Sequence, residues 1–325
     1  MGFNSISPSY FLAPMAHITH SAFRRLVADF GGYGALFTEM LSGRALRYDN
    51  LPGSPYTKRR VQEKRVFYQV LLSGDEDIPA IITRLKSVGP FAIDLNLGCP
   101  APEVTRFQAG AALFRDRERC ARMLDTVRAH WRGLLTVKCR LGDNQSGWEE
   151  EFVKRLRIFE SAGIDAIFLH PRFSDEKLKR TARWERFGWA AGLTGIPIVA
   201  NGDISLSSLA DGRKGLLAPA RGIMIGRMAA VMPWIFAVLS GDAPIFDYRE
   251  VWERFYGYLL EDFSPEKALG RLKEFNAYYA RNFFFGHELF AAVQSSASCE
   301  AALERARKFF EKPQKISADP SVAGI

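Results

Sequence analysis

Residues 134–170 read LLTVKCRLGDNQSGWEEEFVKRLRIFESAGIDAIFLH, and this stretch decides the fold class. Two apolar, β-rich runs, residues 134–140 and 165–170, lie on either side of a segment with helical periodicity at residues 152–159. Three consecutive glutamates at the start of that segment favour a helix, because negative charge stabilises a helix N-terminus. A strand, a helix and a second strand in this order predict a parallel sheet whose faces are covered by helices.

The same alternation extends over the first 225 residues. Further short apolar runs occur at residues 10–14, 34–38, 66–71, 91–97, 196–200 and 222–225. Each run is separated from the next by enough chain for a crossover helix. Eight such units predict a closed (β/α)8 TIM barrel, a fold that commonly takes about 250 residues. An open doubly wound sheet is the alternative.

The strand pattern stops after Pro244, and helical periodicity takes over. It predicts helices over residues 248–262 and 265–284, followed by two short helices within residues 287–311, and a frayed tail over residues 316–325. We therefore predict a barrel domain, residues 1–243, and a small all-helical C-terminal domain, residues 244–325.

The composition is that of a globular protein. The 325 residues are 47% hydrophobic and 25% charged, which excludes disordered and collagen-like chains. The four cysteines show no ligand-like spacing, which argues against a zinc site and a disulfide framework. Because there is neither an apolar run of about 18 residues nor a secretory signal, we expect a cytoplasmic protein without a membrane span.

The charge is unevenly distributed. The chain carries a formal net charge of +8. Residues 244–325 contain 11 Lys and Arg and 12 Asp and Glu, so the remaining 33 basic and 24 acidic residues give the barrel a net charge of +9. Two basic loops, residues 43–60 and 171–183, contribute to this excess. They predict an anionic partner such as nucleic acid, with a solvated charged face as the alternative.

Every predicted strand ends in a polar side chain or a backbone turn. In a TIM barrel the reactive groups lie at the carboxyl ends of the strands. A single polar residue there often only ties down a loop, whereas a complete set predicts an active site. The set consists of Pro14 and Met15, Thr38 and Glu39, Gln69, Asn96 and Cys99, Lys138 and Arg140, His170 and Arg172, Asn201 to Asp203, and Gly226 and Arg227.

The last two strand ends predict a phosphate site. The Asn201-Gly202-Asp203 turn and the Gly226-Arg227 pair offer small residues, backbone amides and a guanidinium where such barrels typically bind phosphate. Lys138 and His170 lie on the adjoining strands. With Gln69 as a hydrogen-bonding group for a ring edge, they could complete a site for a phosphorylated, delocalised cofactor.

Cys99 follows the fourth strand in a Gly-Cys-Pro turn that exposes its thiol to the mouth. A free thiol has a pKa near 8.5 and is mostly protonated at neutral pH, so general acid is a better role than nucleophile. Cys120 and Cys139 are predicted to be buried structural cysteines, and Cys299 carries no functional signal.

These residues occur in motifs that together resemble the tRNA-dihydrouridine synthases over residues 10–311. The motifs are APM at 13–15, TEM at 38–40, NLGCP at 96–100, AGAAL at 109–113, VKCRLG at 137–142, HPR at 170–172, NGDI at 201–204 and IGR at 225–227.

The resemblance implies a flavoenzyme that reduces the C5=C6 bond of specific uridines in tRNA, with FMN in the barrel mouth and NADPH as electron donor. Cys99 would donate the proton to C5. Asn96 would contact the uracil, Arg140 and Arg172 would contact substrate, and the helical domain would bind tRNA. The FMN contacts carried over are Pro14, Met15, Ala16, Gln69, Lys138, His170, Asn201, Gly202, Asp203, Gly226 and Arg227. We expect a monomer with no metal ion.

The chain departs from the family pattern in three places. Met228 replaces a glycine after the IGR motif, residues 17–20 read HITH instead of GVTD, and Lys177-Leu178 replace a common Gln and Tyr. Three alternative functions remain open: an FMN barrel acting on a free pyrimidine or another small molecule, a lyase with Lys138 as a Schiff base, and an RNA-binding module without catalysis.

Overall fold

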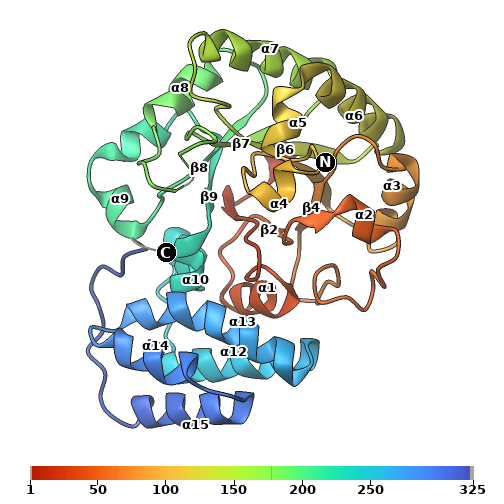
Figure 1. Ribbon diagram of the computed structural model, residues 1–325. Helices are drawn as coiled ribbons and strands as arrows, with labels where there is room; N and C mark the ends of the chain where they lie inside the picture. The colour runs from red at the N-terminus through yellow and green to blue at the C-terminus, as the bar shows by residue number, and fades with distance from the viewer. Residues whose placement is uncertain (1, 177, 323–325) are drawn as a thin grey trace.

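The computed structural model describes residues 2–176 and 178–322, and its main body is a barrel with a helical domain beside it (Figure 1). Lys177, one of the predicted departures, and residues 323–325 of the predicted tail lie outside the described residues. The eight predicted barrel strands are confirmed. They are β1 (Tyr10–Leu12), β2 (Leu36–Phe37), β4 (Val66–Leu71), β5 (Ala92–Leu97), β6 (Leu134–Arg140), β7 (Ala166–His170), β8 (Ile198–Asn201) and β9 (Gly222–Ile225).

All strand pairs are parallel, and the sheet order is β1-β9-β8-β7-β6-β5-β4-β2. A parallel bridge between Phe11 and Ala35 joins the two ends of this order. The barrel is therefore nearly closed, as predicted, and is not an open doubly wound sheet. The sequence analysis missed a further short strand, β3 (Leu41–Ser42), which pairs with β4. Two residues are too few to show an alternating pattern.

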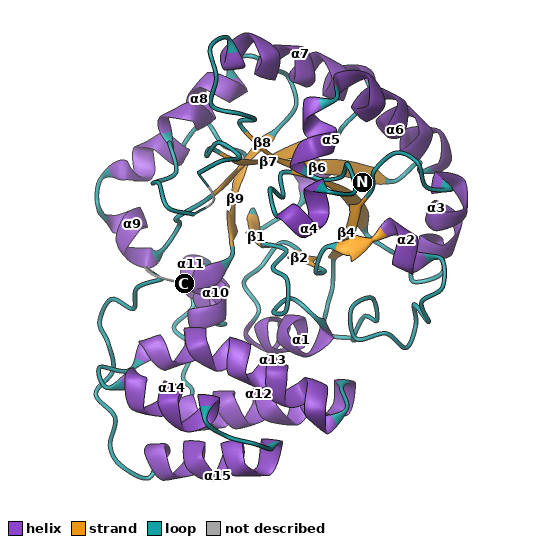
Figure 2. Ribbon diagram, viewed as in Figure 1, coloured by secondary structure: helices purple, strands orange, loops and turns teal. Residues whose placement is uncertain are grey.

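Helices surround the strands on the outside of the barrel (Figure 2). The larger ones are α1 (Ser21–Phe30), α3 (Ile78–Lys86), α6 (Arg117–His130), α7 (Trp148–Ser161) and α8 (Glu185–Ala191). The N-cap of α3 is Asp77, whose carboxylate accepts a hydrogen bond from the Ala80 amide at 3.2 Å. Short helices lie in the loops and after the last strands: η1 (Phe3–Ser5), α2 (Gly43–Leu46), α4 (Pro102–Thr105), α5 (Ala111–Arg115), α9 (Leu206–Ala210), η2 (Arg213–Leu217), α10 (Arg227–Val231) and α11 (Ile235–Leu239).

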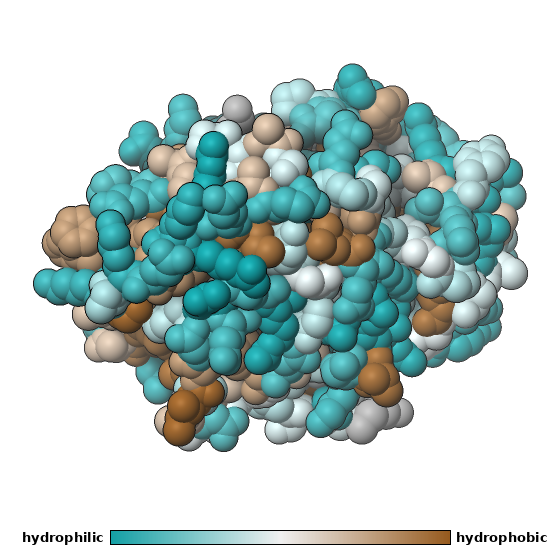
Figure 3. Space-filling view, turned by 90° about the horizontal axis from the view of Figure 1, so that it is seen from below, coloured by the Kyte–Doolittle hydropathy of each residue, from teal (hydrophilic) through white to brown (hydrophobic). Residues whose placement is uncertain are grey.

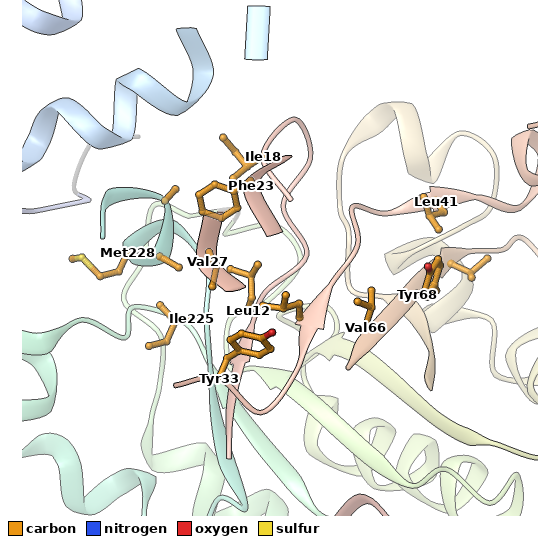
Figure 4. Packing of buried hydrophobic residues seen from close by; sticks show 14 of the residues in the cluster. Leu12, Ile18, Phe23, Val27, Tyr33, Leu41, Val66, Tyr68, Ile225 and Met228 are labelled. Atoms are coloured by element: carbon orange, nitrogen blue, oxygen red, sulfur yellow. The ribbon is translucent and has the colours of Figure 1, made fainter. Parts of the chain in front are cut away.

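The strands separate two apolar layers. The outer layer packs the strands against the helices, and Figure 4 shows part of it, from Leu12 through Phe23 and Val27 to Met228. Met228 is only 3% exposed, so the residue that replaces the family's glycine packs into this layer.

The inner layer lies inside the barrel at the amino-terminal ends of the strands. Its five aromatic residues, which we call the aromatic floor, are Phe3, Phe11, Phe37, Phe67 and Phe168. Ring centroids lie 4.8 Å apart for Phe37 and Phe67, and 4.9 Å apart for Phe37 and Phe168. The floor fills the end of the barrel opposite the predicted site, so that end is a packed core.

The predicted helical domain is present after the barrel. It contains α12 (Tyr248–Asp262), α13 (Pro265–Tyr279), η3 (Ala280–Asn282), α14 (Gly286–Gln294) and α15 (Cys299–Phe310). It packs on α1 through Phe23, whose ring lies 6.2 Å from Phe255 and 6.1 Å from Phe275. Seen from below, the molecule is mostly hydrophilic, with separate hydrophobic patches (Figure 3).

His20, in one of the segments that depart from the family pattern, is fully buried at this contact. Its ring centroid lies 4.9 Å from that of Phe263 and 6.1 Å from that of Phe255. The side chain that replaces the family's aspartate thus packs between the barrel and the helical domain.

The tail differs from the frayed segment that we expected, as far as the structure describes it. Ile316 forms an antiparallel bridge with Phe283, and the Ser317 amide donates to the Asn282 carbonyl at 2.7 Å. Farther along, the Val322 carbonyl accepts a hydrogen bond from Arg227 at 3.4 Å. These partners are distant in sequence, so local composition could not reveal them. No helix in the described ranges is long and apolar enough to cross a membrane.

Candidate active site

A cavity of about 190 Å³ lies at the carboxyl ends of the strands, where the sequence predicted the site. Most of the predicted residues line it. They are Pro14, Met15, Lys138, Arg140, His170, Arg172, Asn201, Gly202, Asp203, Gly226 and Arg227. Gln69, Asn96 and Cys99 lie in a hydrogen-bonded group on β4, β5 and the loop that follows, and Ala16 is exposed next to Met15. A wider groove of about 610 Å³ shares Arg172 and Arg227 with the cavity.

Two glycines let the backbone approach closely at one end of this cavity. Gly202 has a φ of +118°, and a Cβ there would lie 2.6 Å from His170 Cδ2. A Cβ on Gly226 would lie 3.3 Å from Met15 Sδ. Any larger residue at position 202 would therefore be strained and would collide with the histidine ring. The two glycines thus keep the cavity free of side chains beside His170 and Met15.

Arg172 is the centre of a buried network at the same end. Its Nη2 donates to both oxygens of Asp203, at 2.8 and 2.6 Å, and Arg227 Nη2 contacts Asp203 Oδ1 at 3.2 Å. Arg172 Nη1 lies 2.8 Å from His170 Nε2. A guanidinium can only donate, so His170 Nε2 accepts and its proton resides on Nδ1. Burial and the charge of Lys138 hold the pKa of His170 well below its usual value, which keeps the ring neutral.

The two arginines predicted to contact substrate form part of the cavity wall. Arg172 is 2% exposed and Arg140 is 8% exposed. Arg140 Nη1 donates to the Phe173 carbonyl at 3.1 Å. Their low exposure places them beside small groups that enter the cavity, away from the outer surface on which an RNA backbone could lie.

A chain of hydrogen bonds runs inside the barrel from β6 to the Cys99 loop. Thr136 Oγ1 donates to Asp94 Oδ1 at 2.7 Å, and Gln69 Nε2 donates to Asp94 Oδ2 at 2.7 Å. Asn96 Nδ2 donates to Gln69 Oε1 at 2.9 Å. Asn96 Oδ1 then accepts from the backbone amide of Cys99 at 3.0 Å.

Asp94 was not predicted from the sequence. It lies two residues before Asn96 on the same strand and so points to the same face, which is the signal that could have revealed it. Its carboxylate is fully buried, and burial raises its pKa to about 6. An acidic residue inside an otherwise apolar strand needs partners, and the amide of Gln69 is one of them.

Cys99 is half-buried, and burial raises the pKa of its thiol. Arg140 and Lys138 lie close enough to oppose this shift. Burial and the neighbouring Arg140 in turn lower the pKa of Lys138 to about 8. The thiol is thus protonated at neutral pH and lies near two cations, an arrangement suited to donating a proton. Cys120, Cys139 and Cys299 are all buried, so the first two are confirmed as core residues.

Part of the predicted basic surface is used inside the protein. Lys58 Nζ lies 2.5 Å from Asp262 Oδ1, and Arg60 binds the same carboxylate. Arg183 pairs with Glu176. Lys58 and Arg60 therefore tie the barrel to α12, so part of the positive charge expected to attract an anionic partner is paired within the protein. Within residues 2–176 and 178–322, no group of three or more potential metal ligands occurs.

Comparison with protein families and known proteins identifies relatives of this chain. Residues 11–311 match the family model described as "Dihydrouridine synthase (Dus)". A "Probable tRNA-dihydrouridine synthase" from Rhodobacter capsulatus is 32% identical over 244 residues, 72% of each chain. The "tRNA-dihydrouridine synthase B" from Pasteurella multocida is 31% identical over 71% of this chain and 68% of its own.

Solved structures show a similar fold at low identity. The old yellow enzyme from Trypanosoma cruzi has a TM-score of 0.52 at 9% identity, over 78% of this chain and 93% of its own. A 2-naphthoyl-CoA reductase has a TM-score of 0.51 at 10% identity, over 73% of this chain and 50% of its own. At such identities the likeness concerns the barrel fold alone.

Proposed function

The chain belongs to the dihydrouridine synthase family of enzymes, and from this premise we propose that it uses FMN and NADPH to reduce the C5=C6 bond of specific uridines in tRNA. The barrel, residues 1–243, would hold the flavin and carry the chemistry. The helical domain, residues 244–325, would form the second wall of the RNA site. Monomeric state and cytoplasmic location stay predictions.

The cavity residues fit a phosphorylated, planar cofactor. Gly226 and the Arg227 guanidinium would hold the phosphate, together with the turn from Asn201 to Asp203. Lys138 and neutral His170 would face the ring system. When bound and reduced by NADPH, the flavin would supply the hydride that the uracil receives at C6. The fit rests on the two glycines, since side chains there would fill the space beside His170 and Met15.

Cys99 would act as the acid. The observation that carries the proposal is a partly buried thiol of raised pKa that interacts with Arg140 and Lys138, two cations of the cavity wall. Its proton would pass to C5 of the uracil as the C5=C6 bond is lost. The thiolate left behind would be stabilised by Lys138 and Arg140, the two cations nearest to it.

Asn96 has little capacity left for the substrate. Its Oδ1 already accepts two backbone hydrogen bonds, and one of its two N–H groups binds Gln69. We propose that the second N–H of Asn96 donates to a carbonyl oxygen of the uracil. The target base must leave its stack to come this close to the loop, as in other enzymes that act on a nucleic-acid base.

The test combines flavin content with RNA analysis. The purified protein should be yellow and release FMN, and restoring its gene to cells that lack it should restore dihydrouridine at particular tRNA positions. Restoration with the Cys99→Ala variant should fail, although the variant retains flavin. Colourless protein that takes up no FMN, or an unchanged dihydrouridine map, would refute the proposal.

The other functions compatible with the sequence give different results in the same assays. An FMN barrel for free pyrimidines would reduce uracil or uridine monophosphate and leave tRNA unchanged. A Schiff-base lyase would lack flavin, and borohydride in the presence of its substrate would trap an adduct on Lys138. An RNA-binding module without catalysis would bind tRNA but would not oxidise NADPH.

A further inference from the structure

We propose that Asp94 is a positioning residue, which fixes the orientation of the Gln69 and Asn96 side-chain amides and, through them, the conformation of the Cys99 loop. Its role in the reaction rests on the proposed function of Cys99. Its role in shaping the loop does not, because the hydrogen bonds that carry it involve only this chain.

The buried carboxylate of Asp94 fixes the orientation of the Gln69 amide. Asp94 lies inside the barrel on β5 with no exposed surface, and its two oxygens accept from Gln69 Nε2 and Thr136 Oγ1, both at 2.7 Å. An ionised carboxylate can only accept hydrogen bonds. Gln69 must therefore turn its nitrogen towards Asp94 and its oxygen away from it.

The second step is the transfer of this polarity to Asn96. Because Gln69 presents Oε1, Asn96 must present Nδ2, and the bond between them is 2.9 Å long. This orientation leaves Asn96 Oδ1 facing the loop. There it accepts from the backbone amides of Gly98, at 3.2 Å, and Cys99, at 3.0 Å.

Reversing the direction of these hydrogen bonds would disrupt the loop. If position 94 donated to Gln69, both amides would have to turn over, and Asn96 would then point its NH₂ group at the two backbone N–H groups of Gly98 and Cys99. Donors would then face donors at partly buried positions, which is unfavourable. The loop would have to move away, and the Cys99 thiol would move with it.

Variants of Thr136 distinguish loss of the negative charge at position 94 from reversal of the hydrogen bond with Gln69. In an Asp94→Asn variant, the new NH₂ group can donate to the Thr136 hydroxyl, so the side-chain oxygen can still face Gln69. Adding Thr136→Val removes that acceptor, and the new NH₂ group at position 94 is then favoured to face Gln69. Thr136→Ser, which keeps the hydroxyl, is the matched control.

The readout is the rate at which iodoacetamide alkylates Cys99, followed by mass spectrometry of the intact holoprotein. Cys120, Cys139 and Cys299 are buried and serve as internal controls for folding. Thr136→Val alone should leave the rate within about twofold of the wild-type value. If the two single variants acted independently, the alkylation rate of the double variant would change by the product of their fold-changes. We expect the rate of Asp94→Asn combined with Thr136→Val to differ from this product by at least about threefold, because the two side chains are in contact and therefore coupled. Asp94→Asn combined with Thr136→Ser should match Asp94→Asn alone.

An alkylation rate of the double variant that equals the product of the two single effects would overturn the proposal. So would a double variant that is less stable but has an unchanged Cys99 rate, because Asp94 would then serve only stability. If this double variant does not fold, Asp94→Asn combined with Thr136→Ala takes its place, because alanine removes the same hydroxyl acceptor. An alkylation rate that equals the product of the two single effects there would equally overturn the proposal.

The assay also separates this proposal from the proposed function. Alkylation needs no tRNA and no NADPH. Coupled changes in Cys99 reactivity in a protein that never reduces tRNA would leave the positioning role standing and refute the reaction. Normal tRNA reduction, together with a Cys99 alkylation rate that shows no coupling between the two substitutions, would support the proposed reaction and refute the positioning role.

Discussion

The two ends of the barrel are made by the same strands and differ in almost every property. At the amino-terminal end the inward positions carry the aromatic floor, and two residues farther along β4 and β7 they carry polar groups. On β4, Phe67 lies in the floor and Gln69 belongs to the site, and on β7 the pair is Phe168 and His170. Inward-facing side chains recur every second residue along a strand. On these strands, therefore, one inward side chain packs in the floor and the next one belongs to the predicted site.

This difference indicates where stability comes from. The floor consists of rings in mutual contact and needs no ligand to be stable. The mouth instead gathers Lys138, Arg140, Arg172 and Arg227 around one cavity, with Asp203 as a shared counter-charge for two of them. Such an arrangement is costly in the absence of an anion. Changes in the floor should therefore affect folding, and changes in the mouth should affect binding and turnover.

The sharpest test at the mouth is Cys99→Ala. Loss of the general acid should lower the rate of uridine reduction about 10²- to 10⁴-fold. Because the thiol is half-exposed, the free energy of unfolding should change by less than about 1 kcal/mol. Single-turnover kinetics on tRNA and urea denaturation measure the two effects, and Cys299→Ala is the control. A rate close to that of the wild type would remove Cys99 from the mechanism.

Phe168→Ala is the corresponding test at the floor. Removing a ring that contacts four others should lower the free energy of unfolding by about 3–5 kcal/mol. The FMN content of the protein that remains folded should stay the same. Denaturation curves and flavin fluorescence give both quantities. The milder Phe168→Leu should cost less, and a large loss of flavin from folded protein would show that the two ends are coupled.

Asp94 lies between the floor and the mouth, and its titration should make the free energy of unfolding depend on pH. Burial raises its pKa to about 6, above the value of about 3.9 in an unfolded chain. The folded state thus binds more protons between these values, so this group lowers the stability of the wild type as the pH rises from about 4 to about 6. Asparagine does not titrate.

The free energy of unfolding of Asp94→Asn, minus that of the wild type, should therefore increase over this interval by up to about 3 kcal/mol and stay constant above it. Urea denaturation at a series of pH values measures the difference. A difference that does not vary with pH would mean that the carboxylate is not penalised by burial.

The smallest effect is expected outside both ends, on the basic loop. Arg59 is exposed, whereas Arg60 binds Asp262 of the helical domain. Replacing Arg59 with Glu should weaken tRNA binding and reduce the slope of log affinity against log salt by about one or two. Arg60→Glu should in addition destabilise the contact between the domains. Binding measured at several salt concentrations distinguishes them, and an unchanged slope would exclude Arg59 from the RNA surface.

Most of the architecture could be predicted because it is encoded locally. The strands from residue 66 to residue 225 and the helix over residues 248–262 lie where periodicity placed them, within two residues. The site followed from one rule, that barrel strands present their functional groups at their carboxyl ends. Gly202 and Arg227, predicted in this way, line the cavity.

The features that escaped prediction depend on partners distant in sequence. The pairing of the tail with Phe283, and the use of Lys58 and Arg60 to bind Asp262, are set by tertiary contacts that no local pattern records. Asp94 was missed for another reason. Its role appears only when Gln69 and Thr136, from the two neighbouring strands, are seen on either side of it.

The pairing of β1 with β9 also bears on how the chain is made. Tyr10 lies opposite Ile223, so the first strand cannot gain this partner until roughly 200 further residues have left the ribosome. At about 5–20 residues per second this takes on the order of 10–40 s. During that time Phe11 and the other early phenylalanines lack the enclosure that buries them in the finished barrel. A nascent chain of this kind is a natural client for chaperones that shield apolar segments during synthesis.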